Sequence, residues 1–291
     1  MSVARAAALI REGKLVAFPT ETVYGLGANA LDPAAVGRIF QAKGRPRSSP
    51  LIVHVDSIRM ARSLVTCWPD SAQKLADRYW PGPLTLVLPK QSHVPDIVTA
   101  GLPTVGLRMP AHPLALELIR TAGVPIAAPS ANRFTELSPT AAAHVPEALA
   151  DFVLDGGPAR VGIESTVLSL VGEPTLLRPG VIPLPEIEAA IGPVRTARSK
   201  PAGPHPSPGM HARHYLPRTP LYLGELPSSG RGAYLRIGVE MPADPLAYAA
   251  ALYETLHRLD ADALDWIAIE LPPDTPEWSG VLDRLRRAAT R

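Results

Sequence analysis

The sequence predicts a mixed α/β fold, and three features support this class. Short apolar runs typical of buried strands alternate with segments whose apolar residues recur at helical spacing through residues 1–195. The same alternation recurs on a smaller scale after residue 218. The 291 residues are 46% apolar and 19% charged, which suffices for a core that buries about three quarters of the unfolded surface. The order of the strands does not follow from these patterns.

The expected elements follow one another along the chain. Residues 1–11 fit an amphipathic first helix, and residues 15–18 fit a short buried strand. Asp32 and Pro33 supply an N-cap and a first-turn proline for a helix that ends at Gly44. Further strands are expected at 51–55, 84–88, 104–108, 125–128, 152–154, 165–170 and 175–178, and further helices after Asp56 and at 69–79, 113–121 and 140–149. After residue 218 we expect strands at 234–239 and 266–270 and helices at 245–259 and 281–291.

Proline divides the chain into parts. It makes up 34 of the 291 residues, about twice its usual share, and it is concentrated within residues 193–220. Such a stretch cannot form a helix or a central strand and is typical of a semi-rigid tether. We therefore predict a first domain over residues 1–195, a proline-rich linker or lid over 196–217 and a small C-terminal domain over 218–291.

Several classes of protein are excluded by what the sequence lacks. No run of 18 apolar residues and no secretory signal pattern is present, so we expect no membrane span. The one cysteine, Cys67, cannot form an internal disulfide, and we expect a cytoplasmic protein. Neither a phosphate-binding G-x-x-x-x-G-K-[ST] loop nor a G-x-S-x-G nucleophile motif occurs.

Two further patterns are too weak to assign a site. Residues 25–30 have the spacing of a dinucleotide-binding motif, but residues 20–24 separate them from the strand and the helix begins only after Asp32. His205, His211 and His214 could suggest zinc, but no cysteine or carboxylate supports them in the linker. We expect solvated histidines there and no metal site.

Short polar segments stand at the ends of the expected strands, where open α/β sheets bind their ligands. They are residues 19–22, 43–49, 108, 128–132 and 163–166. Each alone has a structural explanation, since loop serines form turns and basic residues favour helix C-termini. Lys43, Arg45 and Arg47, however, have serines beside them and no acid. Such a cluster is typical of a phosphate site.

These segments resemble the motifs of the YrdC-like family. Lys43-x-Arg45 together with Ser130-x-Asn132 matches its K-x-R…S-x-N signature, and residues 16–27 resemble its opening strand and loop. Further motifs follow in family order at residues 43–46, 50–54, 105–110, 164–167 and 177–180. Residues 207–210 with His214 and Tyr215 resemble the linker of the family's two-domain threonylcarbamoyl-AMP synthases. The similarity covers residues 1 to about 220 well and the rest loosely.

The resemblance implies a fold and an activity. The fold would be a YrdC-like twisted mixed sheet with flanking helices that form a concave site, followed by a small, shortened α/β C-terminal domain. The activity would be that of a nucleotidyltransferase that condenses L-threonine, bicarbonate or CO2 and ATP into threonylcarbamoyl-adenylate and pyrophosphate. A separate transferase would pass the threonylcarbamoyl group to tRNA. This chemistry needs positioning and neutralised phosphate charge rather than a covalent nucleophile.

The resemblance also assigns residues to the site. Lys43 and Arg45 would be catalytic residues that hold the ATP phosphates. Ser49, Thr104, Ser130, Asn132, Ser138, Arg178 and Tyr215 would complete the ATP site, and Thr22, His54, Arg108, Ala128 and Ser165 would bind threonine. Arg108 suits the threonine carboxylate because a guanidinium can donate two parallel hydrogen bonds to it. Glu21 and Glu164 lie in these segments without an assigned role.

Alternatives stay open at this point. Mg2+ would enter with ATP and be held mainly by the triphosphate, since no carboxylate cluster is visible in the sequence. The main alternative is an RNA-binding module of the YrdC-like type without adenylation activity, because Arg38, Arg45 and Arg47 could bind phosphates of either kind. Hydrogenase-maturation carbamoyltransferases share the domain type, but they are longer and carry further domains. The sequence leaves open the oligomeric state, the general acid or base, direct tRNA binding and the role of the shortened C-terminal domain.

Overall fold

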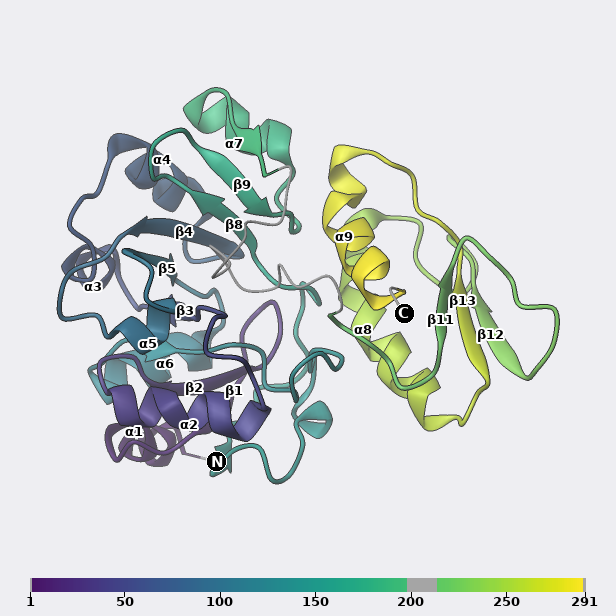
Figure 1. The fold of residues 1–291 in the computed structure, drawn as a ribbon, viewed down its shortest axis with the longest axis horizontal. Coiled ribbons are helices and arrows are strands. Elements are labelled where there is room, and N and C mark those ends of the chain that lie inside the picture. The colour runs from purple at the N-terminus through teal and green to yellow at the C-terminus, as the bar shows by residue number, and fades with distance from the viewer. Residues whose placement is uncertain (1, 198–213, 290–291) are drawn as a thin grey trace.

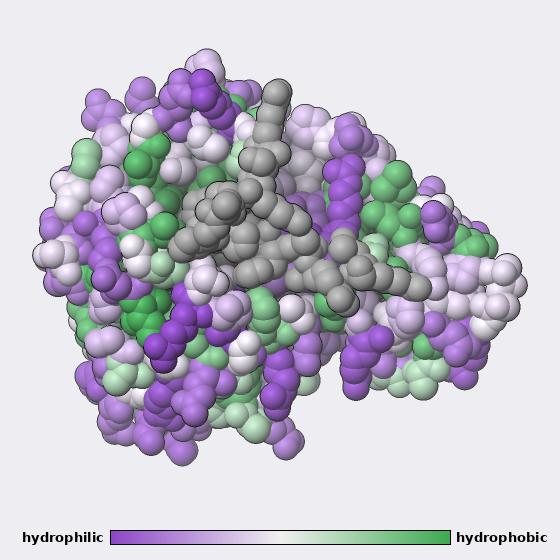
Figure 2. Space-filling model, viewed as in Figure 1, coloured by the Kyte–Doolittle hydropathy of each residue, from purple (hydrophilic) through white to green (hydrophobic). Residues whose placement is uncertain are grey.

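The computed structural model describes residues 2–197 and 214–289, which form two sheets with their helices. In Figure 1 the larger sheet lies on the left and the smaller one on the right, with α8 (Pro245–Ala261) and α9 (Ser279–Ala288) between them. Figure 2 shows polar and apolar residues mixed over this face of both parts. Across the described ranges, no helix is long and apolar enough to cross a bilayer.

The larger sheet has ten strands in the order β10-β9-β8-β4-β5-β3-β6-β2-β1-β7. Parallel pairs such as β3 with β5 and β4 with β8 lie beside antiparallel pairs such as β4 with β5, so the sheet is mixed, as expected. The strands are β1 Val16–Phe18, β2 Gly25–Asn29, β3 Ile52–His54, β4 Leu84–Pro89, β5 Thr104–Arg108, β6 Ile126–Ala127, β7 Phe152–Val153, β8 Thr166–Ser169, β9 Thr175–Arg178 and β10 Arg195–Thr196.

Helices cover both faces of this sheet. Val16 and Phe18 of β1 belong to the apolar cluster that contains α1 and α6, whereas Ala17 belongs to the cluster that contains α2 and α4. This alternation is the two-residue period of a strand buried on both faces. The helices of this part are α1 Val3–Arg11, α2 Pro33–Lys43, α3 Ile58–Ser63, α4 Asp70–Tyr79, α5 Asp96–Thr99, α6 Pro113–Ala122 and α7 Leu184–Ile191, with a short 3-10 helix, η1, at Ala142–His144.

Helix α2 matters most for the site because its C-terminal end carries Lys43. Asp32 accepts hydrogen bonds from the backbone N–H groups of Ala34 and Ala35, and Pro33 occupies the first turn. Gly44 ends the helix with a left-handed φ of 65°. The predicted boundaries are confirmed, and they fix the direction in which the chain leaves the helix toward Arg45.

The C-terminal part is a three-stranded parallel sheet packed against α8 and α9. Its strands β11 Leu221–Leu223, β12 Gly232–Leu235 and β13 Trp266–Ile269 lie in the order β11-β13-β12, and a 3-10 helix, η2, spans Pro276–Trp278. Its apolar cluster includes Leu252 and Leu285 and continues into Val23, Leu137 and Ile163 of the larger part. The two parts therefore share a packed apolar interface.

Several expected elements are wrong in extent or absent. Residues 140–149 form only η1, because Pro146 removes a backbone donor and breaks a longer helix. The strand expected at 234–239 ends at Leu235, before a turn in which Gly238 has a φ of 76°. Ser57 rather than Asp56 caps α3.

Other elements were not expected at all. These are β2, β10, β11, α5 and α7. Strand β2 is rich in glycine and alanine, which weaken the strand pattern. The glycines have a packing reason, since a Cβ at Gly27 would lie 2.8 Å from the ring of Phe18.

Candidate functional site

A pocket of about 50 Å³ lies where the polar segments at the strand ends meet. The segments that follow β1 and β6, the ends of β3, β5 and β9, and the residues before β8 all contribute to its wall. Of the predicted site residues, those that line it are Thr22, Arg45, His54, Arg108, Ala128, Ser130, Ser165, Arg178 and Tyr215. The structure thus brings together residues separated by more than 190 positions in the sequence.

The surroundings of the pocket are electropositive. The buried lysines and arginines of the described ranges all lie in or beside it, and they are Lys43, Arg45, Arg108, Arg178 and Arg284. Against these stand two buried carboxylates, those of Glu21 and Glu164. Because a buried charge without a counter-charge is costly, this surplus of positive charge favours an anionic ligand.

We call Lys43 and Arg45 the floor of this site, since Arg45 lines the pocket and Lys43 is buried directly behind it. Lys43 Nζ donates to Ser130 O at 2.7 Å and also to Asn132 O, and Arg45 Nη2 donates to Ser49 Oγ at 2.9 Å. Burial, and then the charge of Arg45, lowers the pKa of Lys43 well below its usual value. Burial also lowers the pKa of Arg45 to about 10. A phosphate would stabilise both charged forms.

Arg108 and His54 pair at the ends of β5 and β3 and line another part of the pocket. Arg108 Nη2 lies 2.8 Å from Glu21 Oε1, and Arg108 Nε donates to Gly82 O at 3.2 Å. Glu21 Oε2 accepts from Ala111 N, so this carboxylate is held from two sides. Burial, and then the charge of Arg108, lowers the pKa of His54 to about 3, so the imidazole is neutral at pH 7.

Ser165 and Arg178 also line the pocket and contact each other. Arg178 Nη2 donates to Ser165 Oγ at 3.2 Å and its Nε donates to Ser165 O at 3.1 Å, while Ser165 Oγ shares a hydrogen bond with Thr85 Oγ1 at 2.7 Å. One residue predicted for threonine and one predicted for the nucleotide are therefore in direct contact.

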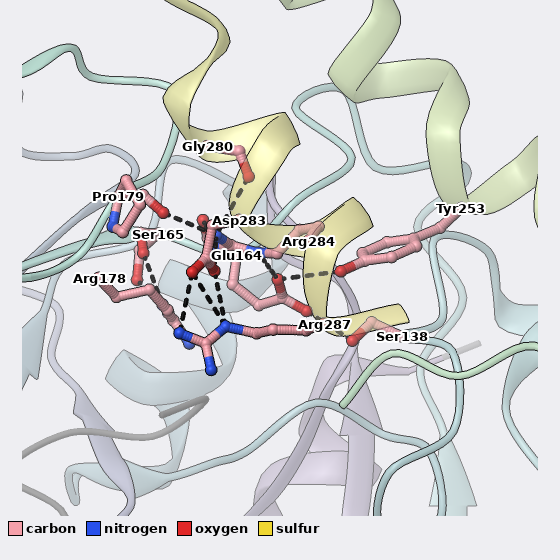
Figure 3. A network of polar contacts seen from close by, with 10 residues as sticks. All are labelled: Ser138, Glu164, Ser165, Arg178, Pro179, Tyr253, Gly280, Asp283, Arg284 and Arg287. Carbon is pink, nitrogen blue, oxygen red and sulfur yellow. Dashed lines mark hydrogen bonds and ion pairs between the residues drawn. The ribbon is translucent and has the colours of Figure 1, made fainter. Parts of the chain in front are cut away.

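Glu164 and Arg284 had no role assigned from the sequence, yet they form the centre of a polar network at the pocket, and Glu164 itself lines the pocket (Figure 3). Glu164 Oε1 accepts from Ser138 Oγ at 2.5 Å, and its Oε2 accepts from Arg284 Nε at 2.8 Å and from Tyr253 at 3.3 Å. Burial alone would raise the pKa of Glu164, but Arg284 and Arg178 outweigh it and lower this pKa to about 2. The only signal for Glu164 in the sequence was its position directly before Ser165, which was predicted to bind threonine.

The described end of the linker reaches the pocket through His214 and Tyr215. Tyr215 is 1% exposed, its ring lies 5.8 Å from that of Tyr253, and burial raises its pKa to about 12. His214 is buried and packs edge-on against Phe134, so the expectation of a solvated histidine is wrong here because aromatic side chains enclose it. His205, His211 and residues 207–210 lie outside the described residues.

Some predicted residues do not line the pocket. Lys43, Ser49, Asn132 and Ser138 are buried directly behind its wall, where each has a hydrogen bond to another residue of the site. Thr104 does not line the pocket either: it begins β5 whereas Arg108 ends it, about 13 Å of extended strand away, so its role in the ATP site stays a prediction. Arg47 of the expected cationic cluster is exposed.

The two carboxylates at the pocket have little capacity for a metal ion. Glu21 pairs with Arg108, and Glu164 pairs with Arg284. Within residues 2–197 and 214–289, no group of three or more His, Cys, Asp or Glu side chains is arranged to hold a metal. A divalent cation at this site would therefore depend on phosphate oxygens of a ligand.

Comparison with known proteins agrees with this geometry. Residues 8–180 match the Sua5/YciO/YrdC family, described as "Telomere recombination", and residues 182–290 match the "Threonylcarbamoyl-AMP synthase, C-terminal domain". The chain is 44% identical to the threonylcarbamoyl-AMP synthase of Pyrococcus abyssi, over 98% of this chain and 93% of the relative. It is 43% identical to that of Bacillus subtilis, over 99% and 92% respectively.

The structural comparison leads to the same group. A crystal structure of P. abyssi Sua5 complexed with L-threonine superposes with a TM-score of 0.93 at 42% identity, covering 99% of this chain and 94% of that one. The sequence alignment with the P. abyssi relative spans 318 positions, so that relative contains segments that this 291-residue chain lacks. The chain therefore belongs to the Sua5/YciO/YrdC family, and it carries the C-terminal domain of the threonylcarbamoyl-AMP synthases.

Proposed function

We propose that this protein is a threonylcarbamoyl-AMP synthase, which condenses L-threonine, bicarbonate or CO2 and ATP into threonylcarbamoyl-adenylate and pyrophosphate. The observation that supports it most is the surplus of buried positive charge at a pocket where the predicted threonine and nucleotide residues meet. The relatives of this name match the chain over nearly its whole length. The product would be consumed in the cytoplasm by a transferase that modifies tRNA.

The proposed step is an attack of a carbamate oxygen on the α-phosphorus of ATP. A new P–O bond forms as the bond to the β-phosphate oxygen breaks and pyrophosphate leaves. Negative charge concentrates on the phosphates in this step, so the cations of the floor would lower the barrier by neutralising it. Mg2+ would enter as the ATP complex and remain bound to the triphosphate.

The other end of the pocket would hold threonine. Arg108 would bind the threonine carboxylate, with Glu21 keeping the guanidinium in place. His54, neutral at pH 7, has a buried Nδ1 without a hydrogen-bond partner among the described residues. A polar group of the amino acid could supply that partner.

The nucleotide end would require the linker to change position. A pocket of about 50 Å³ holds a few water molecules, which is too little for a nucleotide. His214 and Tyr215 line the pocket and would have to move when ATP enters. We also propose the division into residues 1–195, 196–217 and 218–291, since the large sheet ends at Thr196 and the small sheet begins at Leu221.

The burial of the floor argues against an RNA-binding module as the main function. Lys43 and Arg45 are 4% and 6% exposed, so the phosphates of a polynucleotide backbone would not reach them without opening the site. A free triphosphate is small enough to enter such a pocket once the linker moves. Weak binding of tRNA at another surface is compatible with this proposal.

The deciding experiment measures pyrophosphate release from ATP by the purified protein, with detection of the adenylate by mass spectrometry. We expect release that requires threonine and bicarbonate together and falls to background when either is omitted. The proposal fails if no combination of these substrates releases pyrophosphate. Salt-sensitive tRNA binding without pyrophosphate release would instead support the RNA-binding alternative.

A further inference from the structure

Arg284 of α9 is a fully buried cation that comes from the C-terminal part of the chain. Its side chain is 0% exposed and extends toward the pocket wall, as Figure 3 shows. No residue of α9 lines the pocket itself. Arg284 is therefore a buried cation that can act on the pocket only through the residues that line it.

Its hydrogen bonds reach two separate segments of the pocket wall. Arg284 Nε donates to Glu164 Oε2 at 2.8 Å and Nη2 donates to Glu164 O at 3.0 Å, so both the carboxylate and the backbone of Glu164 are held. Arg284 Nη1 donates to Pro179 O at 2.7 Å. Glu164 directly precedes Ser165, and Pro179 directly follows Arg178.

The two held segments also contact each other at the pocket. Arg178 donates from Nε and Nη2 to Ser165 O and Ser165 Oγ. Arg284 therefore joins two segments of the pocket wall, since Glu164, Ser165 and Arg178 all line the pocket. A shift of either segment would change the distance between these two side chains.

The surroundings of Arg284 fix its own position. Asp283 Oδ2 accepts from Arg284 Nη1 at 3.1 Å, and Arg287 in turn donates to Asp283 at 2.9 Å. A Cβ at Gly280 would lie 2.5 Å from Gly180 O, so this glycine allows α9 to approach the backbone beside Pro179. The close approach of α9 at Gly280 and the fixed guanidinium of Arg284 together indicate that this contact has a defined geometry.

A buried arginine that pairs with a carboxylate is not the most stabilising residue for such a position. Replacing a buried ion pair by apolar side chains of similar volume is often neutral or stabilising. A guanidinium is required, however, to donate in one plane to a carboxylate and to two backbone carbonyls. The chemistry of the contact therefore indicates a requirement for geometry.

We propose that Arg284 is a positioning residue through which the C-terminal part completes the adenylation site, by fixing Glu164 and Pro179 and thereby Ser165 and Arg178. This inference rests on the proposed function, and it assigns to α9 an indirect part in the reaction, through the position of the pocket wall. Arg284 does not line the pocket, so its effect on the reaction would pass through the two wall segments.

The test compares Arg284→Lys, Arg284→Met, Glu164→Gln and the double variant Arg284→Met/Glu164→Gln in the full-length protein. Arg258→Met, which removes an exposed arginine of α8, is the matched control. For each protein we would measure thermal unfolding, pyrophosphate release with KM for threonine and for ATP, and calorimetric affinity for each substrate. Arg284→Met leaves the Glu164 carboxylate buried without its main partner, whereas the double variant does not.

We expect Arg284→Met to lose both stability and activity. The double variant should regain most of the stability, yet its kcat/KM should stay at least about tenfold below wild type, because the bonds to Glu164 O and Pro179 O remain absent. Losses in the two single variants should be non-additive, since both act through one contact. Arg284→Lys keeps the charge without the fork and should also lose about tenfold. The Arg258→Met control should match wild type.

A double variant with wild-type kcat/KM, or an Arg284→Lys variant with wild-type kcat/KM, would overturn the positioning role. If Arg284→Met does not fold, these two variants still decide the matter. If wild-type protein itself releases no pyrophosphate, the proposed function has failed, and calorimetry tests the positioning role separately. In that case, unchanged threonine and ATP affinities in Arg284→Lys would overturn it, and a loss of about tenfold would support it.

Discussion

The floor of the pocket and the junction between the two parts both bury positive charge, but they do so in opposite ways. At the floor, Lys43 and Arg45 donate to carbonyl and hydroxyl oxygens, and both pKa values lie below their usual range. At the junction, Arg284 faces the carboxylate of Glu164. Burial acts to lower the pKa of Arg284, but Tyr215, Glu164 and Asp283 raise it above the usual value.

This difference separates charge available for a ligand from charge that holds the protein together. An unmatched buried cation is stabilised when an anion binds, so the floor gains from a phosphate. In a matched pair each charge is already neutralised by the other, and removing one partner leaves the other buried without a counter-charge. We therefore expect variants of the floor to lose activity and variants of the junction to lose stability as well.

The largest effect should follow from Glu164→Gln at the junction. The change removes the more buried of the two carboxylates that pair with Arg284 and leaves only Asp283, and breaking a buried pair costs about 3–5 kcal/mol. Denaturant unfolding at pH 7 measures the loss, with the exposed Glu225→Gln as control. A difference of less than about 1 kcal/mol between the two variants would show that the junction is not a matched pair.

The lowered pKa of Glu164 predicts that the stability of the protein falls in acid. The folded protein lowers the pKa of Glu164 from 4.5 to about 2, so the ionised form contributes stability above about pH 4.5 that is lost as the pH falls toward 2. Glu164→Gln should remove this part of the pH dependence. An identical slope in wild type and variant between pH 4.5 and 2 would contradict the assignment.

Arg45→Ala should separate activity from stability at the floor. We expect kcat/KM for ATP to fall by about 100-fold, the size seen when one charge-stabilising group is removed from an active site. The free energy of unfolding should not fall by a comparable amount, because the lost hydrogen bonds are to neutral groups. The exposed Arg47→Ala, two residues on, is the control. Equal kinetics in the two variants would remove Arg45 from the site.

His257 offers a smaller test of how the two parts stay together. It stacks on His144 with ring centroids 4.0 Å apart, and its Nε2 lies 3.1 Å from Ser138 O. Burial, and then His144, lowers its pKa to about 4. The neutral form thus contributes stability above about pH 6.5 that is lost as the pH falls toward 4. His257→Gln should flatten the unfolding free energy in this window, and an unchanged slope would count against it.

The smallest expected effect is at the end of α2, which carries Lys43. Gly44→Ala meets no atom within 4 Å, but it forces a side chain into a φ of 65°, which costs about 1 kcal/mol. Thermal unfolding measures this cost. Activity should change little, because the helix keeps its N-cap at Asp32. A large loss of activity would mean that the exit from α2 sets the position of the floor.

Much of the site could be predicted because each part of it is local in sequence. The helix from Pro33 to Lys43 has its own cap and stop signals, and the polar segments stand directly after strands. Such signals act over a few residues, so they survive without knowledge of the fold. Thr104 was predicted for the ATP site and Arg108 for threonine, and the structure places them at opposite ends of one strand.

Long-range contacts account for what could not be predicted. Nothing near Glu164 in sequence indicates that Arg284, 120 residues later, would pair with it. His214 was expected in solvent, although Phe134 and Tyr215 enclose it. Strand β2 escaped detection because the glycine that weakens its pattern is required by the ring of Phe18.

By itself, the sequence determined the mixed α/β class, the proline-rich division and the cationic and polar segments that identify the family. Periodicity, caps and motifs act over a few residues, so these features need no knowledge of distant contacts. Only the tertiary structure decided which charges are matched and which remain for a ligand. Pairing energy depends on the distance between buried groups, and for Arg284 and Glu164 the fold alone sets that distance.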